Sequence, residues 1–197
     1  MKVFSATPTP ACIWLTGLPC AGKSTIARAL SKRLNSKAIL NTVLDADEIR
    51  HTLNADLGFC RGDRTENARR IAEVAKMFLT VGAIPIVAAI SPYRDDRNLA
   101  ASIIRPFSMI EIYVHAPVDV CIARDVKGLY ARARMGEVTD LVGVDVCYEP
   151  PERPHVTIDS ALLGVEQAVE HLWLAISADV VPVGMMLAHG TAQRQQR

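Results

Sequence analysis

The residues from Ala11 to Leu34, ACIWLTGLPCAGKSTIARALSKRL, decide the fold of this chain. The first six are a short apolar run, which predicts a buried strand, and Ile26, Leu30 and Leu34 recur at a four-residue spacing, which predicts an amphipathic helix. Between them, residues 17–24 match the pattern G-x-x-x-x-G-K-[ST] in full. A glycine-rich turn between such a strand and helix surrounds a phosphate group with backbone N–H groups. We therefore predict a nucleotide phosphate-binding loop.

This loop indicates a nucleotide-binding protein, and further features of the sequence narrow its class. We expect the Lys23 ammonium to reach the β- and γ-phosphates and the Ser24 hydroxyl to ligate Mg²⁺. The alternative, an ordinary glycine turn with an exposed lysine, is disfavoured by the full match and by the flanking strand and helix. The sequence has no N-K-x-D run for guanine recognition, and its 197 residues are few for an AAA-type ATPase, so a small-molecule kinase fits best. The predicted nucleotide-binding residues are Gly17, Leu18, Pro19, Cys20, Ala21, Gly22, Lys23, Ser24 and Thr25.

Apolar runs and segments of helical period alternate along the rest of the chain. Further strands are predicted at Ala38–Leu44, Ile84–Ile90, Met109–Val114 and Val156–Ile158. One helix is predicted to follow the capping arrangement of Asp63 and Glu66 and to end at Gly82, with Ile71, Val74, Phe78 and Val81 facing inward. Three more helices are predicted after Ser91-Pro92, after Pro117, and from about Val165 to Ala178. This alternation predicts an α/β fold of three layers with a central parallel sheet. Polar clusters follow the strands at 17–25, 45–50, 91–97 and from 115 onward, so we expect them to converge on one edge as a single active site.

The acidic cluster at the end of the second predicted strand indicates where an acceptor would bind. Asp45, Asp47 and Arg50 combine carboxylates, which serve Mg²⁺ or orient an attacking hydroxyl, with a cation for an anionic acceptor. Further on, Phe59 in a loop stands near Arg64, Asn67 and Arg70, a set suited to adenine plus a phosphate-like group. The plainer alternatives are an acidic helix start, a core phenylalanine and a solvated arginine face, and they stay open.

Composition narrows the class of protein. With 50% hydrophobic and 22% charged residues, the chain is expected to fold as one domain over 1–197, with a core at about 11–178 and a loose tail at about 179–197. A net charge of +1 gives no support for binding nucleic acid or a membrane surface, and no apolar run is long enough to span a bilayer. Five scattered cysteines without a C-x-x-C pair, and no signal-peptide pattern, favour a reducing cytoplasm.

Several blocks resemble the adenylylsulfate kinase family, in the family's order. They are LDADEIR (44–50), DLGFCRGDRTENARR (56–70), SPYRDDR (91–97), RDVKGLY (124–130) and GVDVCYEPP (143–151), and the similarity covers about residues 11–160. The resemblance implies transfer of the ATP γ-phosphate, with Mg²⁺, to the 3′-hydroxyl of adenosine 5′-phosphosulfate during sulfate assimilation. A homodimer and an association with an ATP sulfurylase also stay open.

The resemblance also implies roles for individual residues. Asp45 and Asp47 would serve Mg²⁺ and the acceptor hydroxyl, with Ser24 and Asp47 as the metal ligands, and Lys23 would complete the catalytic set. The implied acceptor-site residues are Asp47, Arg50, Phe59, Arg64, Asn67, Ser91, Lys127 and Leu141. Ser91 inherits either a phosphoserine role or, because in-line transfer needs no protein nucleophile, a positioning role. Residues 124–143 resemble a mobile lid that brings Arg124 to the nucleotide and Lys127 to the substrate.

Three departures from the family pattern bear on the acceptor. Pro19 and Cys20 stiffen the phosphate loop and add a thiol to it, and Ala46 replaces a glycine, which is harmless unless that φ is positive. Leu141-Val142 replaces a Phe-Thr pair, so Leu141 is expected to pack on the acceptor purine opposite Phe59 without aromatic stacking. The alternatives are a kinase with a different acceptor and a nucleotide-binding regulatory module without turnover.

Overall fold

The computed structural model describes residues 10–180 and contains one sheet of five parallel strands. The strands are β1 (Cys12–Thr16), β2 (Asn41–Asp45), β3 (Ile84–Ala88), β4 (Met109–His115) and β5 (Val156–Asp159), in the order β2-β3-β1-β4-β5. Every neighbouring pair is parallel. All five carboxyl ends therefore lie at one edge, as the sequence predicts.

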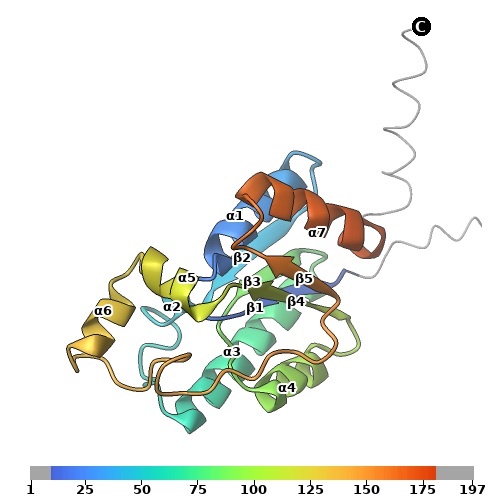
Figure 1. Cartoon of the computed structure of the whole chain (residues 1–197). Coiled ribbons are helices and arrows are strands. Elements are labelled where there is room, and N and C mark those ends of the chain that lie inside the picture. Colours follow the sequence, from blue (N-terminus) through green and yellow to red (C-terminus); the bar gives the residue numbers. More distant parts are fainter. Residues whose placement is uncertain (1–9, 181–197) are drawn as a thin grey trace, which may run out of the picture.

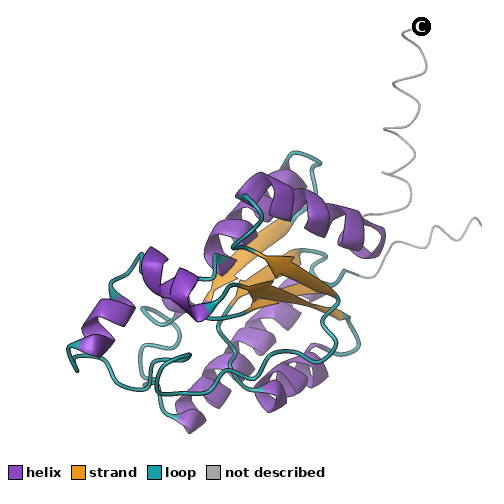
Figure 2. Cartoon of the chain, in the orientation of Figure 1, coloured by secondary structure: helices purple, strands orange, loops and turns teal. Residues whose placement is uncertain are grey.

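Helices cover both faces of this sheet, which confirms the predicted three layers (Figures 1 and 2). On one face lie α1 (Lys23–Asn35) and α7 (Val165–Val180), and on the other α3 (Arg61–Thr80) and α4 (Arg94–Ile104). The short helices α2 (Ala46–Ile49), α5 (Val118–Arg124) and α6 (Leu129–Arg134) lie beyond the carboxyl ends of the strands (Figure 1). The site is thus built on a rigid edge and bordered by short helices.

The central strand β1 is apolar throughout because both of its faces are covered. Ile13 and Leu15 belong to the core cluster on the α1–α7 side, whereas Cys12 and Trp14 belong to the cluster on the α3–α4 side. All four side chains are fully buried. Two cores thus hold the phosphate loop that follows this strand.

The start of α3 differs from the prediction. Its N-cap is Cys60, whose Sγ accepts a hydrogen bond from the Asp63 N–H at 3.4 Å. Asp63 lies inside the first turn, and its carboxylate accepts from the Gly58 N–H at 3.0 Å instead of capping the helix. Glu66 pairs with arginines 69 and 70, because the helix begins too early for it to reach back to the cap.

Some predicted boundaries and burials also shift. Val81 is 69% exposed, since it lies beyond the last residue of α3, and the buried face of the helix passes through Ile71 and Leu79. The strand predicted from Ala38 begins at Asn41, because Ala38 has a φ of 57° in the preceding turn. The last helix reaches Val180, and the rest of the predicted tail, 181–197, lies outside the described residues. Among residues 10–180, no helix is both long and apolar enough to cross a bilayer.

Candidate active site

The phosphate loop has a backbone that only glycine allows at its two ends. Gly17 has a φ of 150°, and a Cβ there would lie 2.2 Å from the Val114 carbonyl oxygen. Gly22, just before α1, has a φ of 98°. Cys20 is left-handed too, with a φ of 61°, a conformation that costs a non-glycine residue energy. The loop is therefore closely held against β4 and opens α1 at a defined angle.

Lys23 is buried at the start of α1 and folds back over this loop. Its Nζ donates to the Gly17 carbonyl at 2.9 Å and to the Leu18 carbonyl at 2.7 Å. Burial lowers the pKa of Lys23 to about 8, against the opposing effect of Asp47. The ammonium is thus a poorly solvated cation at the centre of the loop, where a phosphate oxygen would gain most from it.

The two carboxylates of the acidic cluster differ in their surroundings. Asp45 is only 4% exposed, accepts from the Asp47 N–H at 3.1 Å as the N-cap of α2, and pairs with Arg28 at 3.2 Å. Asp47 is 58% exposed and pairs with Lys127 from the predicted lid, Nζ to Oδ2, at 2.5 Å. The structure therefore gives Asp45 a capping position and leaves Asp47 as the accessible carboxylate.

An aromatic ring flanked by two guanidinium groups forms the far side of the site. Arg50 Cζ lies 4.4 Å and Arg64 Cζ 5.6 Å from the centroid of the Phe59 ring, which is 56% exposed. Arg50 donates to the Gly58 carbonyl at 2.8 Å, and Arg64 to the Phe59 carbonyl at 2.8 Å. An exposed aromatic ring close to two fixed cations suits a planar, anionic ligand such as a nucleotide.

Ser91 follows β3 in a left-handed conformation, with a φ of 43°. Its Oγ accepts a hydrogen bond from the buried Trp14 indole at 3.1 Å, and its carbonyl accepts from Arg97 at 2.7 Å. Arg97 is itself buried and paired with Glu111 at 2.7 Å. These contacts hold the Ser91 hydroxyl in place, which favours the positioning role over a nucleophilic one.

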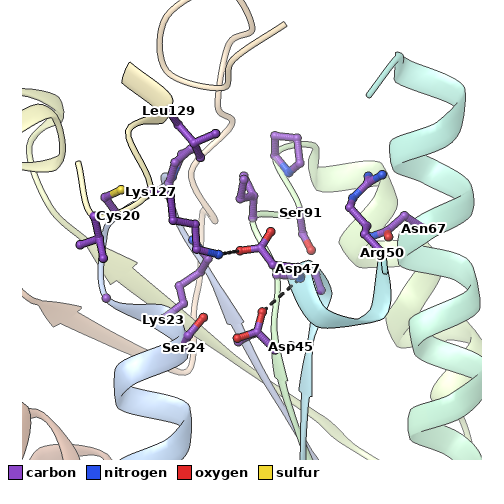
Figure 3. A pocket seen from close by; sticks show the side chains of 18 of the residues that line it. Cys20, Lys23, Ser24, Asp45, Asp47, Arg50, Asn67, Ser91, Lys127 and Leu129 are labelled. Carbon is purple, nitrogen blue, oxygen red and sulfur yellow. Dashed lines mark hydrogen bonds and ion pairs between the residues drawn. The ribbon is translucent and has the colours of Figure 1, made fainter. Parts of the chain in front are cut away.

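A pocket of about 280 Å³ joins these groups. In Figure 3, Lys23 and Ser24 lie on one side, Arg50 and Asn67 on the other, and Asp45, Asp47 and Ser91 between them. The predicted site residues that line it are Pro19, Cys20, Gly22, Lys23, Ser24, Thr25, Asp45, Asp47, Arg50, Phe59, Arg64, Asn67, Ser91 and Lys127. The predicted convergence on one edge is confirmed.

Five predicted residues are not brought into this lining: Gly17, Leu18, Ala21, Arg124 and Leu141. Arg124 braces the outside of the phosphate loop, donating to the Ser160 hydroxyl at 3.1 Å and to the Cys20 carbonyl at 3.4 Å. Leu141 is 6% exposed and packs in the α1–α7 core, because an aliphatic side chain is more stable there than on a wet surface. The prediction that Leu141 contacts the acceptor purine finds no support in this arrangement.

Two further differences concern residues near the pocket. Arg70 does not line it, since its guanidinium is paired with Asp56 at 2.7 Å and Glu66 at 2.8 Å. Ala46 is the first residue of α2 and is not among the described residues with positive φ, so its methyl group is tolerated. Sequence reasoning missed Arg28, which lines the pocket and bridges Asp45 and Glu48. Its position one helical turn after Ser24 was the available signal.

Known proteins resemble this chain in both sequence and structure. The model of the family described as adenylylsulphate kinase matches residues 9–159. The adenylyl-sulfate kinase of Prochlorococcus marinus is 49% identical over 160 residues, covering 81% of this chain and 80% of the relative. That of Geotalea uraniireducens is 42% identical over 181 residues, covering 92% and 87%. The Mycobacterium tuberculosis APS kinase solved in complex with AMPPNP and APS superposes with a TM-score of 0.84 at 36% identity, covering 86% of this chain and 99% of that one.

Proposed function

This chain belongs to the adenylylsulphate kinase family, a family of ATP-dependent kinases, and we propose that its pocket transfers the γ-phosphate of ATP to the 3′-hydroxyl of adenosine 5′-phosphosulfate. One observation carries the proposal. A phosphate loop and an aromatic ring flanked by two arginines form opposite sides of one pocket, with the accessible carboxylate of Asp47 between them. A transfer between two nucleotides requires this order of donor, carboxylate and acceptor.

The donor side binds the triphosphate. We expect the free backbone N–H groups of the loop and of the start of α1 to face the phosphates, and the buried Lys23 ammonium to offset the charge that develops as the γ-phosphoryl leaves. Arg124 supports the loop from outside through the Cys20 carbonyl and Ser160. Its role is to hold the loop in shape.

The family uses Mg²⁺ with ATP, and the oxygen donors of this pocket fit that ion. The Ser24 hydroxyl and the exposed Asp47 carboxylate both line the pocket. Within residues 10–180, no group of three or more His, Cys, Asp or Glu side chains could hold a metal. We expect the ion to be held by the Asp47 carboxylate, the Ser24 hydroxyl, waters and substrate phosphates. When bound, Mg²⁺ neutralises the phosphate charge and orients the γ-phosphoryl group.

The acceptor side positions the nucleotide that is phosphorylated. Phe59 offers a face to the base, while Arg50 and Arg64 offer charge to the phosphosulfate. Asp47, between the two sides, accepts the proton of the 3′-hydroxyl or holds that hydroxyl in line. Ser91, fixed by Trp14, limits the acceptor from the β3 side.

Lys127 connects the predicted lid with this chemistry. It reaches from the segment before α6 over the mouth of the pocket to Asp47 (Figure 3). Both side chains are more than half exposed, so this ion pair is worth less than about 1 kcal/mol and can exchange easily. We expect Lys127 to move from Asp47 to the phosphates when the triphosphate binds.

An ADP-release assay across candidate acceptors tests the proposed function. With ATP and Mg²⁺, release should require adenosine 5′-phosphosulfate, and the product should carry the new phosphate on its 3′-oxygen. AMP, adenosine and guanosine 5′-phosphosulfate serve as alternative acceptors. Preference for another acceptor would contradict the assignment, and tight ATP binding without turnover on any acceptor would indicate the regulatory module instead. A cytoplasmic location, a homodimer and an association with an ATP sulfurylase stay predictions, and a pull-down with a purified sulfurylase checks the last.

A further inference from the structure

Two carboxamide side chains meet below the acceptor side of the pocket. Asn54 lies in the turn after α2, is fully buried, and donates from Nδ2 to Asn67 Oδ1 at 3.0 Å. Its backbone is fixed as well, because its N–H donates to the Ile49 carbonyl at 3.0 Å and its carbonyl accepts from the Leu57 N–H at 3.1 Å. Asn67 stands on α3 and lines the pocket beside Arg64, three residues earlier on the same helix face. A rigid donor therefore sits directly behind a ligand-facing amide.

The Asn54 side chain contains a buried polar atom that lowers the stability of the fold. Its Oδ1 is buried and has no hydrogen-bond partner, one of two such side-chain atoms among residues 10–180. An unpaired buried carbonyl oxygen is destabilising, and an apolar side chain of the same size would avoid that loss. Within the described residues the one side-chain hydrogen bond of Asn54 is the one to Asn67, so the benefit of a polar side chain here comes through that bond.

That contact determines which end of the Asn67 amide faces the pocket. The carboxamide is planar, with oxygen and nitrogen on opposite sides, so Asn67 Oδ1 held toward Asn54 turns Nδ2 away from it. Asn67 Nδ2 has no acceptor within the described part of the chain, yet it is not a buried unpaired atom. The nitrogen therefore reaches the pocket as a free donor, on the same wall as Arg50 (Figure 3).

We propose that Asn54 is a positioning residue for acceptor specificity, which locks Asn67 with its N–H₂ toward a ring nitrogen of the acceptor purine. The inference rests on the proposed function, because it takes the ligand beside Phe59 to be the acceptor nucleotide. With the base stacked on the exposed ring of Phe59, as the proposed function has it, we take the Asn67 donor on α3 to read the edge of that base. A free carboxamide at position 67 would present oxygen and nitrogen equally and could not select an acceptor atom.

Two variants of Asn54 separate positioning from structure. Asn54→Leu removes the unpaired oxygen but also leaves Asn67 Oδ1 without its partner, so the two effects on stability oppose each other and the fold should be about as stable, while Asn67 becomes free to rotate. Asn54→Asp keeps the shape, and its ionised carboxylate offers only acceptors, so in that form Asn67 must turn its N–H₂ inward and present oxygen to the ligand. The matched control is Asn41→Asp, because Asn41 Nδ2 donates to Asn35 Oδ1 at 2.7 Å in a second carboxamide pair that does not line the pocket.

The readout is the Michaelis constant for adenosine 5′-phosphosulfate and for its 1-deaza, 3-deaza and 7-deaza analogues, each lacking one ring nitrogen. For the native chain, the Michaelis constant of one of the three analogues should be about tenfold higher than that of the natural acceptor, which is the loss expected for one hydrogen bond. In Asn54→Leu and Asn54→Asp, the constant for the natural acceptor should rise by a similar factor and the discrimination should fall to about onefold. The constant for ATP should stay unchanged, and Asn41→Asp should behave as the native chain.

The outcomes distinguish this inference from the proposed function. If the native chain phosphorylates none of these acceptors, the proposed function fails and the inference fails with it. If the native chain is active but treats all three analogues alike, or if Asn54→Leu keeps the native discrimination, only the inference is overturned. A less stable Asn54→Leu whose constants for both substrates rise together would assign Asn54 a purely structural role and would also overturn it.

Discussion

Replacing the buried lysine of the phosphate loop should make the unliganded fold more stable as it abolishes the reaction. In Lys23→Met the side chain keeps its length and apolar stem but loses its charge. The native Lys23 is held inside the loop by the Gly17 and Leu18 carbonyls, and burial lowers its pKa from 10.5 to about 8. The native chain therefore carries the cost of a poorly solvated ammonium at neutral pH.

The size of this cost follows from the pKa. At about 1.4 kcal/mol for each pKa unit, the charged form of Lys23 is disfavoured by about 3 kcal/mol in the folded chain. The two hydrogen bonds lost in the variant offset part of the gain, at about 1 kcal/mol each. At pH 7 we expect Lys23→Met to be about 1 kcal/mol more stable than the native chain.

The pH dependence isolates the charge from the packing. Between pH 8 and 10.5 the unfolded chain still holds the lysine proton while the folded chain releases it, so the native free energy of unfolding rises with pH in this window. Below pH 8 Lys23 is protonated in both the folded and the unfolded chain, so the full cost of burying its charge is present. The stability gap between Lys23→Met and the native chain should therefore shift in favour of the native chain by about 2 kcal/mol from pH 7 to pH 10.

Urea titrations of both chains without nucleotide, at several pH values, measure this gap. Other groups that titrate in alkali contribute to both curves and cancel in the difference. Lys32→Met, which removes an exposed ammonium from the same helix, is the control and should follow the native curve. A gap that stays constant from pH 7 to pH 10 would refute the cost of burial, and near-native turnover of a folded Lys23→Met would refute the phosphate-binding role.

Three further predictions address the remaining site residues. Asp47→Asn should lower turnover by at least about a hundredfold with an unchanged fold, because an amide cannot take the hydroxyl proton. If Asp45→Asn lowered turnover more than Asp47→Asn does, the assigned roles of the two residues would be reversed. Ser91→Ala should lower kcat about tenfold or less, as measured by steady-state kinetics, whereas a competent phosphoserine at this position would contradict the positioning role. Cys20, which lines the pocket, should be alkylated more slowly when ATP·Mg²⁺ is present, whereas the alkylation rate of the exposed Cys60 should not change. Mass spectrometry measures both rates, and a Cys20 rate that is equal with and without nucleotide would show that this thiol lies outside the nucleotide site.

The sequence by itself determined the layers of the fold and the phosphate loop. Each depends on residues close together in the chain: the apolar run of β1, the four-residue spacing on α1, and the two glycines whose φ values the loop requires. Short-range spacing sets strand and helix periods, so these features can be read without knowing what packs against what. The convergence of Asp47 and Ser91 on one edge followed from the same reasoning, because parallel strands share their carboxyl ends.

Only the tertiary structure decided which of these side chains face the pocket and which have structural positions. That Asp45 caps α2 while Asp47 faces the pocket, and that Leu141 is buried in the core, depends on contacts from distant segments. Lys127 meets Asp47 across 80 positions, and even Asn54 reaches Asn67 only because α3 folds back beside the turn after α2. Such contacts leave no periodic signal, since they arise from how the layers pack and not from the spacing within any one element.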